Sequence, residues 1–240
     1  MIKIITLITK FIVATLIALF FSSCGSGIKG SGTITTENRI VTEDFKNIEV
    51  SNGIEVIIEQ SDNKSITVEA DDNLQEHIIT KIENGVLKIK SDENYNSTET
   101  PIVNVKTPVI RGLKANSGSE ITSQNVLVTE NMNVKSDSGS KISIDVEADF
   151  IKIESASGSK IEVSGKALKS ETSSTSGSKI NAENLMTNEV IAKAESGSKT
   201  SIYPIVKLEA KASSGGNISY HKTPKSVSKE ENSGGSVAEE

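Results

Sequence analysis

The chain has 240 residues, of which 35% are hydrophobic and only 3% aromatic, with no tryptophan and one cysteine. Its formal net charge is −6, and loss of Lys3 and Lys10 with a predicted signal peptide lowers it to −8. This acidity excludes a basic nucleic-acid binder, and so few aromatic residues cannot form a base-stacking platform. Because isoleucine and valine still recur at short intervals, we expect a folded, β-rich chain.

The N-terminus has the pattern of a secretory signal. Residues 4–21 form an apolar run that is followed by two serines and then by Cys24. Small residues before this position are typical of a cleavage site, so we predict a lipoprotein signal peptide over residues 1–23. Phe21–Cys24 resembles the lipobox of bacterial lipoproteins, in which the cysteine is diacylated and becomes the new N-terminus. An uncleaved anchor helix and an ordinary signal with an incidental cysteine are the alternatives.

Lipidation of Cys24 is favoured because this lone cysteine has no disulfide partner and stands at the cleavage point. Two or three acyl chains hold a protein on a membrane far more firmly than one. The mature domain is then expected at a membrane, facing an aqueous space outside the cytosol. Residues 24–40 are rich in Gly, Ser and Thr and are predicted to form a flexible tether.

Residues 41–112 are predicted to form an irregular N-terminal β region. Two alternating segments, Ile48–Glu59 and Asn84–Lys90, each contain an Asn-Gly pair, but these pairs lie 32 residues apart. The segment Asp71–Thr80 carries helix signals, because an aspartate precedes its apolar residues. We therefore expect longer, less regular β-rungs here, with one short helix.

The most informative feature is an internal repeat over residues 113–220. A Ser-Gly-Ser motif, which is Ser-Gly-Gly in the last copy, recurs with its central glycines 21, 19, 19, 20 and 18 residues apart. The glycines are Gly118, Gly139, Gly158, Gly177, Gly197 and Gly215. A period near nineteen residues indicates a solenoid. We interpret the glycines as structural turns that need a positive φ or a close backbone approach.

Residues on both sides of each motif alternate between apolar or small side chains and lysine or glutamate, which indicates strands. A column of small residues precedes the motifs: Ala115, Ser136, Ser155, Ser174, Ala194 and Ala212. We expect this column to fill a narrow interior corner, where buried hydroxyls bond a neighbouring serine or a carbonyl of the adjacent rung. A rung of nineteen residues cannot bury its apolar side alone, so rungs must stack about 4.8 Å apart. Residues 221–240 are predicted to be a C-terminal cap and tail.

The order of these motifs resembles the head GIN domain family, described as putative auto-transporter adhesin and as a domain of unknown function. The resemblance covers residues 41–237 and rests on Phe45–Ile54, Val68–Leu74, Asn84–Ile89 and the Ser-Gly-Ser rungs. It implies an all-β fold, a right-handed parallel β-helix-like solenoid, on secreted or lipid-anchored bacterial proteins. It brings no catalytic residues to carry over.

Few residues suggest catalysis, a metal or a cofactor. The two histidines, His77 and His221, lie in no metal-binding spacing, and Cys24 is assigned to lipid, so we expect no metal site, no cofactor and no cysteine nucleophile. The G-x-S-x-G elbow that would carry a serine nucleophile does not occur, and we interpret the repeated Ser-Gly-Ser motif as structural. Calcium-binding β-rolls need aspartate where these turns supply lysine.

Four acidic residues could pair across rungs for glycosidase chemistry: Asp137, Asp145, Asp149 and Glu162. The rungs lack the long inserted loops that wall the groove of a carbohydrate-active β-helix. Charge alternation on a solvated strand face is the simpler explanation, so we expect no enzyme.

The lysine after each of four motifs forms a candidate binding stripe. If the rungs stack in register, Lys141, Lys160, Lys179 and Lys199 line one edge of the molecule about 4.8 Å apart. This stripe could bind an anionic polysaccharide or lipid headgroups. The favoured alternative is that the lysines stay solvated, are partly neutralised by nearby glutamates and prevent edge-to-edge aggregation.

Taken together, the sequence predicts a lipid-anchored β-helix of the bacterial cell envelope, at the outer membrane on its periplasmic or surface face, acting as a non-enzymatic binding or adhesion module. The expected partners are the membrane, bound through the lipid, and either a glycan or an envelope protein. No nucleic-acid partner is expected. The alternatives are a periplasm-facing structural or signalling lipoprotein with a protein partner and, third, a carbohydrate-active enzyme. A glycan site should expose Tyr203 or Tyr220, an enzyme should gather acids in one cleft, and a protein partner should leave an exposed apolar patch.

Overall fold

The structure is a computed structural model, and it describes residues 27–240. The predicted signal peptide and the lipidation residue Cys24 lie outside the described residues. One short 3-10 helix, η1 (Asp72–His77), interrupts a chain that is otherwise strands and turns. The strands are β1 (Ile28–Lys29), β2 (Ile34–Arg39), β3 (Asn47–Val50), β4 (Glu55–Gln60), β5 (Ser65–Asp71), β6 (Ile78–Glu83), β7 (Val86–Ser91), β8 (Tyr95–Asn96), β9 (Ile102–Thr107), β10 (Gly112–Ala115), β11 (Glu120–Ser136), β12 (Lys141–Ser155), β13 (Lys160–Ser174), β14 (Lys179–Ala194), β15 (Lys199–Ala212), β16 (Asn217–Tyr220), β17 (Ser226–Glu231) and β18 (Ser236–Glu239).

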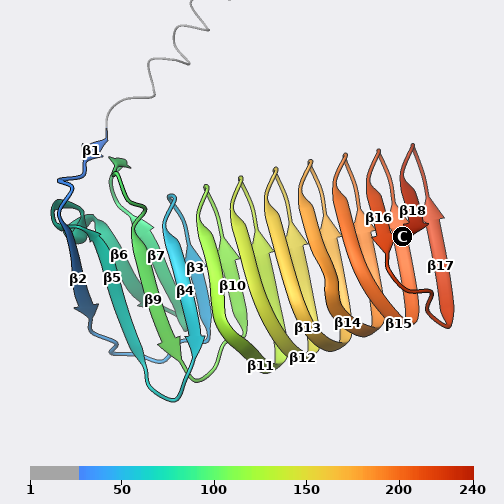
Figure 1. The fold of residues 1–240 in the computed structure, drawn as a ribbon, viewed down its shortest axis with the longest axis horizontal. Coiled ribbons are helices and arrows are strands. Elements are labelled where there is room, and N and C mark those ends of the chain that lie inside the picture. The colour runs from blue at the N-terminus through green and yellow to red at the C-terminus, as the bar shows by residue number, and fades with distance from the viewer. Residues whose placement is uncertain (1–26) are drawn as a thin grey trace, which may run out of the picture.

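The predicted solenoid is confirmed. Each strand from β11 to β15 runs through nearly a whole rung and pairs in parallel with the next strand along the chain. Figure 1 shows these rungs side by side along the long axis, with pointed turns along one edge and rounded bends along the other. The last rungs are broken in two, so that β15 pairs with β16 through its first half and with β17 through its second half.

The pointed turns have a backbone conformation that explains the Ser-Gly repeat. In the first one, Ser117 has φ of 50° and Gly118 has φ of 71°, and the amide of Ser119 donates to the carbonyl of Asn116 at 3.2 Å. Two successive positive φ angles closed by such a bond define a type I′ turn. The glycine amide also donates to the carbonyl of Ser138 in the next turn at 3.1 Å, so the turns themselves form a hydrogen-bonded ladder.

Apolar residues stack in columns inside the solenoid. One column consists of isoleucines that are fully buried in four consecutive rungs, at Ile121, Ile142, Ile161 and Ile180. Beside this column runs a polar seam, as predicted from the small residues. The hydroxyl of Ser140 lies 2.7 Å from the carbonyl oxygen of Ala115 in the preceding rung and 2.7 Å from the hydroxyl of Ser136. Buried serines are therefore satisfied within and between rungs.

The N-terminal region joins the same stack. Strand β3 pairs with β10 and β7, while β4 pairs with β11 and β9, so two further rungs precede the repeat. Antiparallel pairs cover the end of this stack, with β6 on β7 and β5 on β9. The blue-to-green end of Figure 1 shows this cap.

Two expectations for the N-terminal part need correction. The tether predicted over residues 24–40 contains strands, because β2 pairs with β5 and the side chain of Asp71 accepts a 2.6 Å hydrogen bond from the amide of Gly32. The predicted helix Asp71–Thr80 is only the 3-10 helix η1. It stops at His77 because the next residues enter β6 and pair with β7.

Candidate binding groove

The most distinctive surface of the solenoid is a groove along the rounded bends, on the edge opposite the Ser-Gly turns in Figure 1. It crosses the bends of β11 to β15 and has a volume of about 720 Å³. The groove results from the alternation of side chains along each strand. At each bend, one residue faces inward and forms the floor, and the residues before and after it point outward and form the two sides.

Two rows of exposed side chains border the groove. The first row contains Val128, Glu147, Lys166 and Met186, which the strand register places next to one another. The second row lies two residues further along each rung and contains the exposed Glu130, Asp149, Leu168 and Asn188 and the half-buried Ile205. Between the rows, Thr129, Ala148 and Ala167 are less exposed and form a floor of small side chains.

The apolar members of these rows are unusually exposed for a chain so rich in charge. The exposed fractions are 59% at Val128, 56% at Leu168 and 44% at Met186. These residues were not predicted as a site, although the sequence carries a signal for them. In the alternating pattern, Leu168 and Met186 occupy outward positions where lysine, glutamate or serine would be usual.

The charges of the groove are unevenly distributed. Glu147 and Lys166 form an ion pair at 3.6 Å. Glu130 and Asp149 are exposed and have no cationic partner within 4 Å among residues 27–240. The acidic side chains lie on β11 and β12, whereas Leu168, Met186 and Ile205 lie on β13, β14 and β15. Val128 stands beside the carboxylates on β11 and Lys166 stands beside the apolar residues on β13, so the groove is predominantly acidic at one end and predominantly apolar at the other.

The lysine stripe is in register but partly neutralised. Lys141, Lys160, Lys179 and Lys199 pair with one another in sequence along the stack. The ammonium of Lys141 lies 2.6 Å from Glu120, and the hydrogen bond to Glu120 raises the pKa of Lys141. The ammonium of Lys160 lies 2.9 Å from Glu162, and the hydrogen bond from Lys160 lowers the pKa of Glu162. Lys179 and Lys199 are exposed and have no carboxylate within 4 Å in the described part of the chain.

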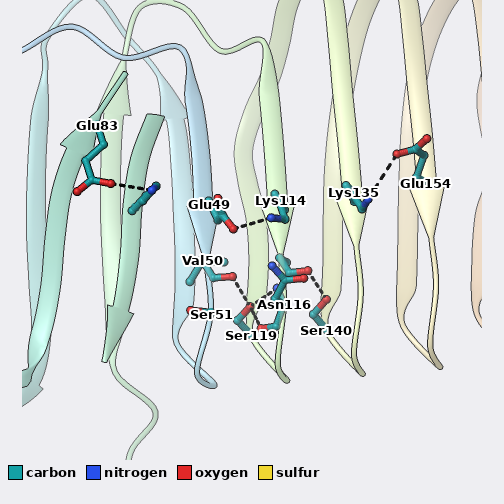
Figure 2. A network of polar contacts seen from close by, with 12 residues as sticks. Glu49, Val50, Ser51, Glu83, Lys114, Asn116, Ser119, Lys135, Ser140 and Glu154 are labelled. Atoms are coloured by element: carbon teal, nitrogen blue, oxygen red, sulfur yellow. Dashed lines mark hydrogen bonds and ion pairs between the residues drawn. The ribbon is translucent and has the colours of Figure 1, made fainter. Parts of the chain in front are cut away.

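The flat face that leads into the Ser-Gly turns is covered by ion pairs between rungs. Figure 2 shows Lys114 bound to Glu49 at 2.6 Å and, further along the stack, Lys135 facing Glu154 at 3.9 Å. Beneath them, the hydroxyl of Ser119 donates to the carbonyl of Val50 at 3.2 Å. The charges of these four residues are matched within the molecule.

The four acidic residues considered for glycosidase chemistry are not gathered in one cleft. Asp137 lies in a Ser-Gly turn, where the Ser157 hydroxyl lowers its pKa, while Asp149 borders the groove and Glu162 binds Lys160. Asp145 pairs in register with Ser164 on the next rung. Within residues 27–240, no group of three or more His, Cys, Asp or Glu is placed to hold a metal ion, and no helix is long and apolar enough to cross a membrane.

The tyrosines do not form an exposed glycan platform. Tyr220 is buried, and the ammonium of Lys229 lies 4.7 Å from its ring centre. Tyr203 is half-buried on β15. Of the three surfaces that would separate the candidate functions, the exposed apolar patch is the one that the described chain presents.

Comparison with known proteins identifies relatives of this architecture. The family model described as "Putative auto-transporter adhesin, head GIN domain" matches residues 44–224. A putative adhesin from Bacteroides fragilis has a solved structure that aligns with a TM-score of 0.82 at 18% identity, over 89% of this chain and 100% of that one. A putative adhesin from Parabacteroides distasonis aligns with a TM-score of 0.74 at 20% identity, over 90% and 100%.

A third solved structure, a putative lipid binding protein from Parabacteroides distasonis, aligns with a TM-score of 0.71 at 19% identity, over 89% of this chain and 99% of that one. At such low identity these structures establish the shared fold. No curated protein matches the sequence.

Proposed function

Because this chain belongs to the head GIN domain family of putative auto-transporter adhesins, we propose that it is a non-enzymatic binding module of the bacterial cell envelope, held at a membrane by lipid on Cys24. Its partner in this proposal is a protein. The observation that carries the proposal is the groove itself, which exposes large apolar side chains on a surface that is otherwise rich in charge.

The position of the N-terminus supports this arrangement. Strand β1 pairs with β8, and the hydroxyl of Tyr95 in β8 donates at 2.7 Å to the carbonyl of Asn52, in the turn between β3 and β4. The chain therefore enters the domain at the edge that carries the Ser-Gly turns (Figure 1). Cys24 lies four residues before β1, a span of at most about 14 Å. A lipid on Cys24 would hold that edge near the membrane and leave the groove facing away from it.

Two experiments test the proposal. A Cys24→Ser variant should leave the membrane fraction and partition into the aqueous phase of a detergent extraction, whereas the unaltered protein should stay with the detergent. Retention of both proteins in the detergent phase would contradict the lipid anchor. Protease treatment of intact cells, with lysed cells as the control, then separates the two locations. Digestion in intact cells supports adhesion at the surface, and protection until lysis supports a periplasmic protein partner.

A further inference from the structure

We propose that the groove binds an extended peptide segment in which basic residues are followed by apolar residues, with the basic end over β11 and β12 and the apolar end over β13 to β15. This inference rests on the proposed function, because it identifies the chemistry and orientation of the protein partner.

The shape fits a single extended chain. The groove is a channel between two rows of side chains, and it runs along the solenoid axis over a floor that includes Ala148 and Ala167. Four steps between five rungs, at about 4.8 Å each, give a length of about 19 Å. An extended peptide rises about 3.3 Å per residue, so about six residues fill the groove.

The charge gives the segment a direction. In the half formed by β11 and β12, Glu130 and Asp149 lie in adjacent rungs, because the flanking residues Thr129 and Asn131 pair with Ala148 and Phe150. Two exposed carboxylates this close repel each other, and a lysine or arginine placed between them relieves that repulsion. Glu147 adds no further net charge because Lys166 neutralises it at 3.6 Å.

The other half favours apolar side chains. Leu168, Met186 and Ile205 come from three consecutive rungs and line this half, together with the uncharged Asn188. Methionine is flexible and polarizable and adapts to ligands of different shape, which suits recognition of a peptide side chain. An anionic lipid headgroup would be repelled by Glu130 and Asp149, and a glycan would lack the exposed aromatic ring on which sugars commonly stack.

The test uses three labelled synthetic octapeptides and the folded domain, residues 25–240, measured by fluorescence anisotropy at low and high salt. The first peptide is Arg-Thr-Arg-Thr-Leu-Thr-Ile-Thr, the second replaces both arginines with glutamate, and the third replaces Leu and Ile with serine. We expect the first peptide to bind at least about tenfold more tightly than either of the others. The preference over the glutamate peptide should weaken as salt screens the charges.

Variants of the groove locate the site. Glu130→Lys combined with Asp149→Lys should reverse the preference between the arginine and glutamate peptides. Leu168→Ser combined with Met186→Ser should weaken binding of the arginine peptide, but this variant should still prefer the arginine peptide to the glutamate peptide. The matched controls, Glu195→Lys in a Ser-Gly turn and Val227→Ser on β17, are exposed positions outside the groove and should bind like the unaltered protein.

Equal binding of the three peptides, or equal binding by the groove variants and the controls, would overturn the inference. So would saturable binding of anionic vesicles or heparin that the groove variants abolish. Circular dichroism confirms that each variant is folded. The reversal of charge preference requires a folded domain, so it cannot arise from misfolding. These outcomes are independent of the Cys24→Ser and protease experiments, so the groove inference can fail while the envelope location stands.

Discussion

At the scale of single residues, the pointed turns place serine in a conformation that it seldom adopts. The serine before each central glycine has φ near +50°, from Ser117 to Ser233. A left-handed backbone costs most L-residues about 1–2 kcal/mol, whereas asparagine tolerates it. Two turns before the repeat have asparagine in this left-handed position, in the pairs Asn52-Gly53 and Asn84-Gly85. The Ser-Gly turns of the solenoid are therefore not optimised for stability.

This conformation predicts that Ser196→Asn stabilises the protein. We expect a gain of about 0.5 kcal/mol in the free energy of unfolding, because asparagine fits the left-handed position better than serine. Ser196→Val at the same position should destabilise the protein, since a β-branched side chain suits φ near +53° least. Chemical denaturation of both variants measures the two effects. A destabilising asparagine would show that turn conformation does not limit stability here.

The buried serine seam predicts a larger effect. Ser140 is 1% exposed, and its hydroxyl contacts the carbonyl of Ala115 in the neighbouring rung and the hydroxyl of Ser136. Ser140→Ala leaves the buried Ser136 hydroxyl without a partner and removes one of the two donors to the Ala115 carbonyl, so it should cost about 1–3 kcal/mol of unfolding free energy. Ser143→Ala, at an outward position of β12, should change stability by less than about 0.5 kcal/mol. Equal midpoints in urea for these two variants would show that the seam is not energetically important.

At the scale of elements, ion pairs couple neighbouring strands and respond to pH. Glu83 on β6 lies 2.8 Å from the ammonium of Lys81 and 2.7 Å from that of Lys88 on β7. The hydrogen bond from Lys81, then that from Lys88, lowers the pKa of Glu83 from 4.5 to about 2. Because the folded pKa is lower than the unfolded one, this carboxylate stabilises the fold above pH 4.5. Its contribution is lost as pH falls toward about 2.

A titration of the Glu83 carboxyl by carbon-13 NMR tests this coupling. We expect an apparent pKa near 2 in the unaltered protein. Lys81→Gln and Lys88→Gln should each raise this value, because each removes one hydrogen bond and one positive charge. Lys90→Gln, an exposed lysine on the same strand as Lys88, is the control and should leave the value unchanged. An ordinary pKa in the unaltered protein would mean that the two ion pairs do not persist in solution.

The lysine stripe gives a prediction for a whole column of the stack. Of the four stripe lysines, Lys141 and Lys160 form ion pairs with glutamates. Lys179 and Lys199 have no carboxylate within 4 Å in the described part of the chain. We therefore expect the variant in which all four lysines become glutamine to elute from heparin resin at the same salt concentration as the unaltered protein. Earlier elution of that variant would instead identify the stripe as a site for anionic glycans.

At the scale of the whole molecule, the repeat made the architecture predictable. The spacing of Gly118 to Gly215 and the strand alternation between them indicate a stacked β-solenoid, because both patterns recur in every rung. The groove was harder to predict. Its rows combine residues from five rungs that share no motif, such as Glu130 and Leu168, and only the bend of each rung brings them to one edge. The ordered start of the chain was missed because its anchor, Asp71, is remote in sequence from Gly32.

Parallel pairing between neighbouring rungs predicts that the solenoid tolerates loss of one complete rung. Deleting residues 141–159 joins Ser140 to Lys160 and lets β11 stack on β13 with the isoleucine column intact, since Ile121 then meets Ile161. Because each rung contacts mainly its neighbours, we expect one cooperative unfolding transition whose enthalpy falls by about one-tenth.

Deleting residues 141–150 is the matched control. It removes half a rung, so the remaining strand cannot place both its bend and its Ser-Gly turn in register, and the apolar side chains of the following rungs lose their columns. We expect this shorter deletion to abolish cooperative unfolding, although it removes fewer residues. Thermal unfolding followed by circular dichroism distinguishes the two variants. If the complete-rung deletion is the more damaging one, stability depends on particular residues of β12 rather than on the repeating register.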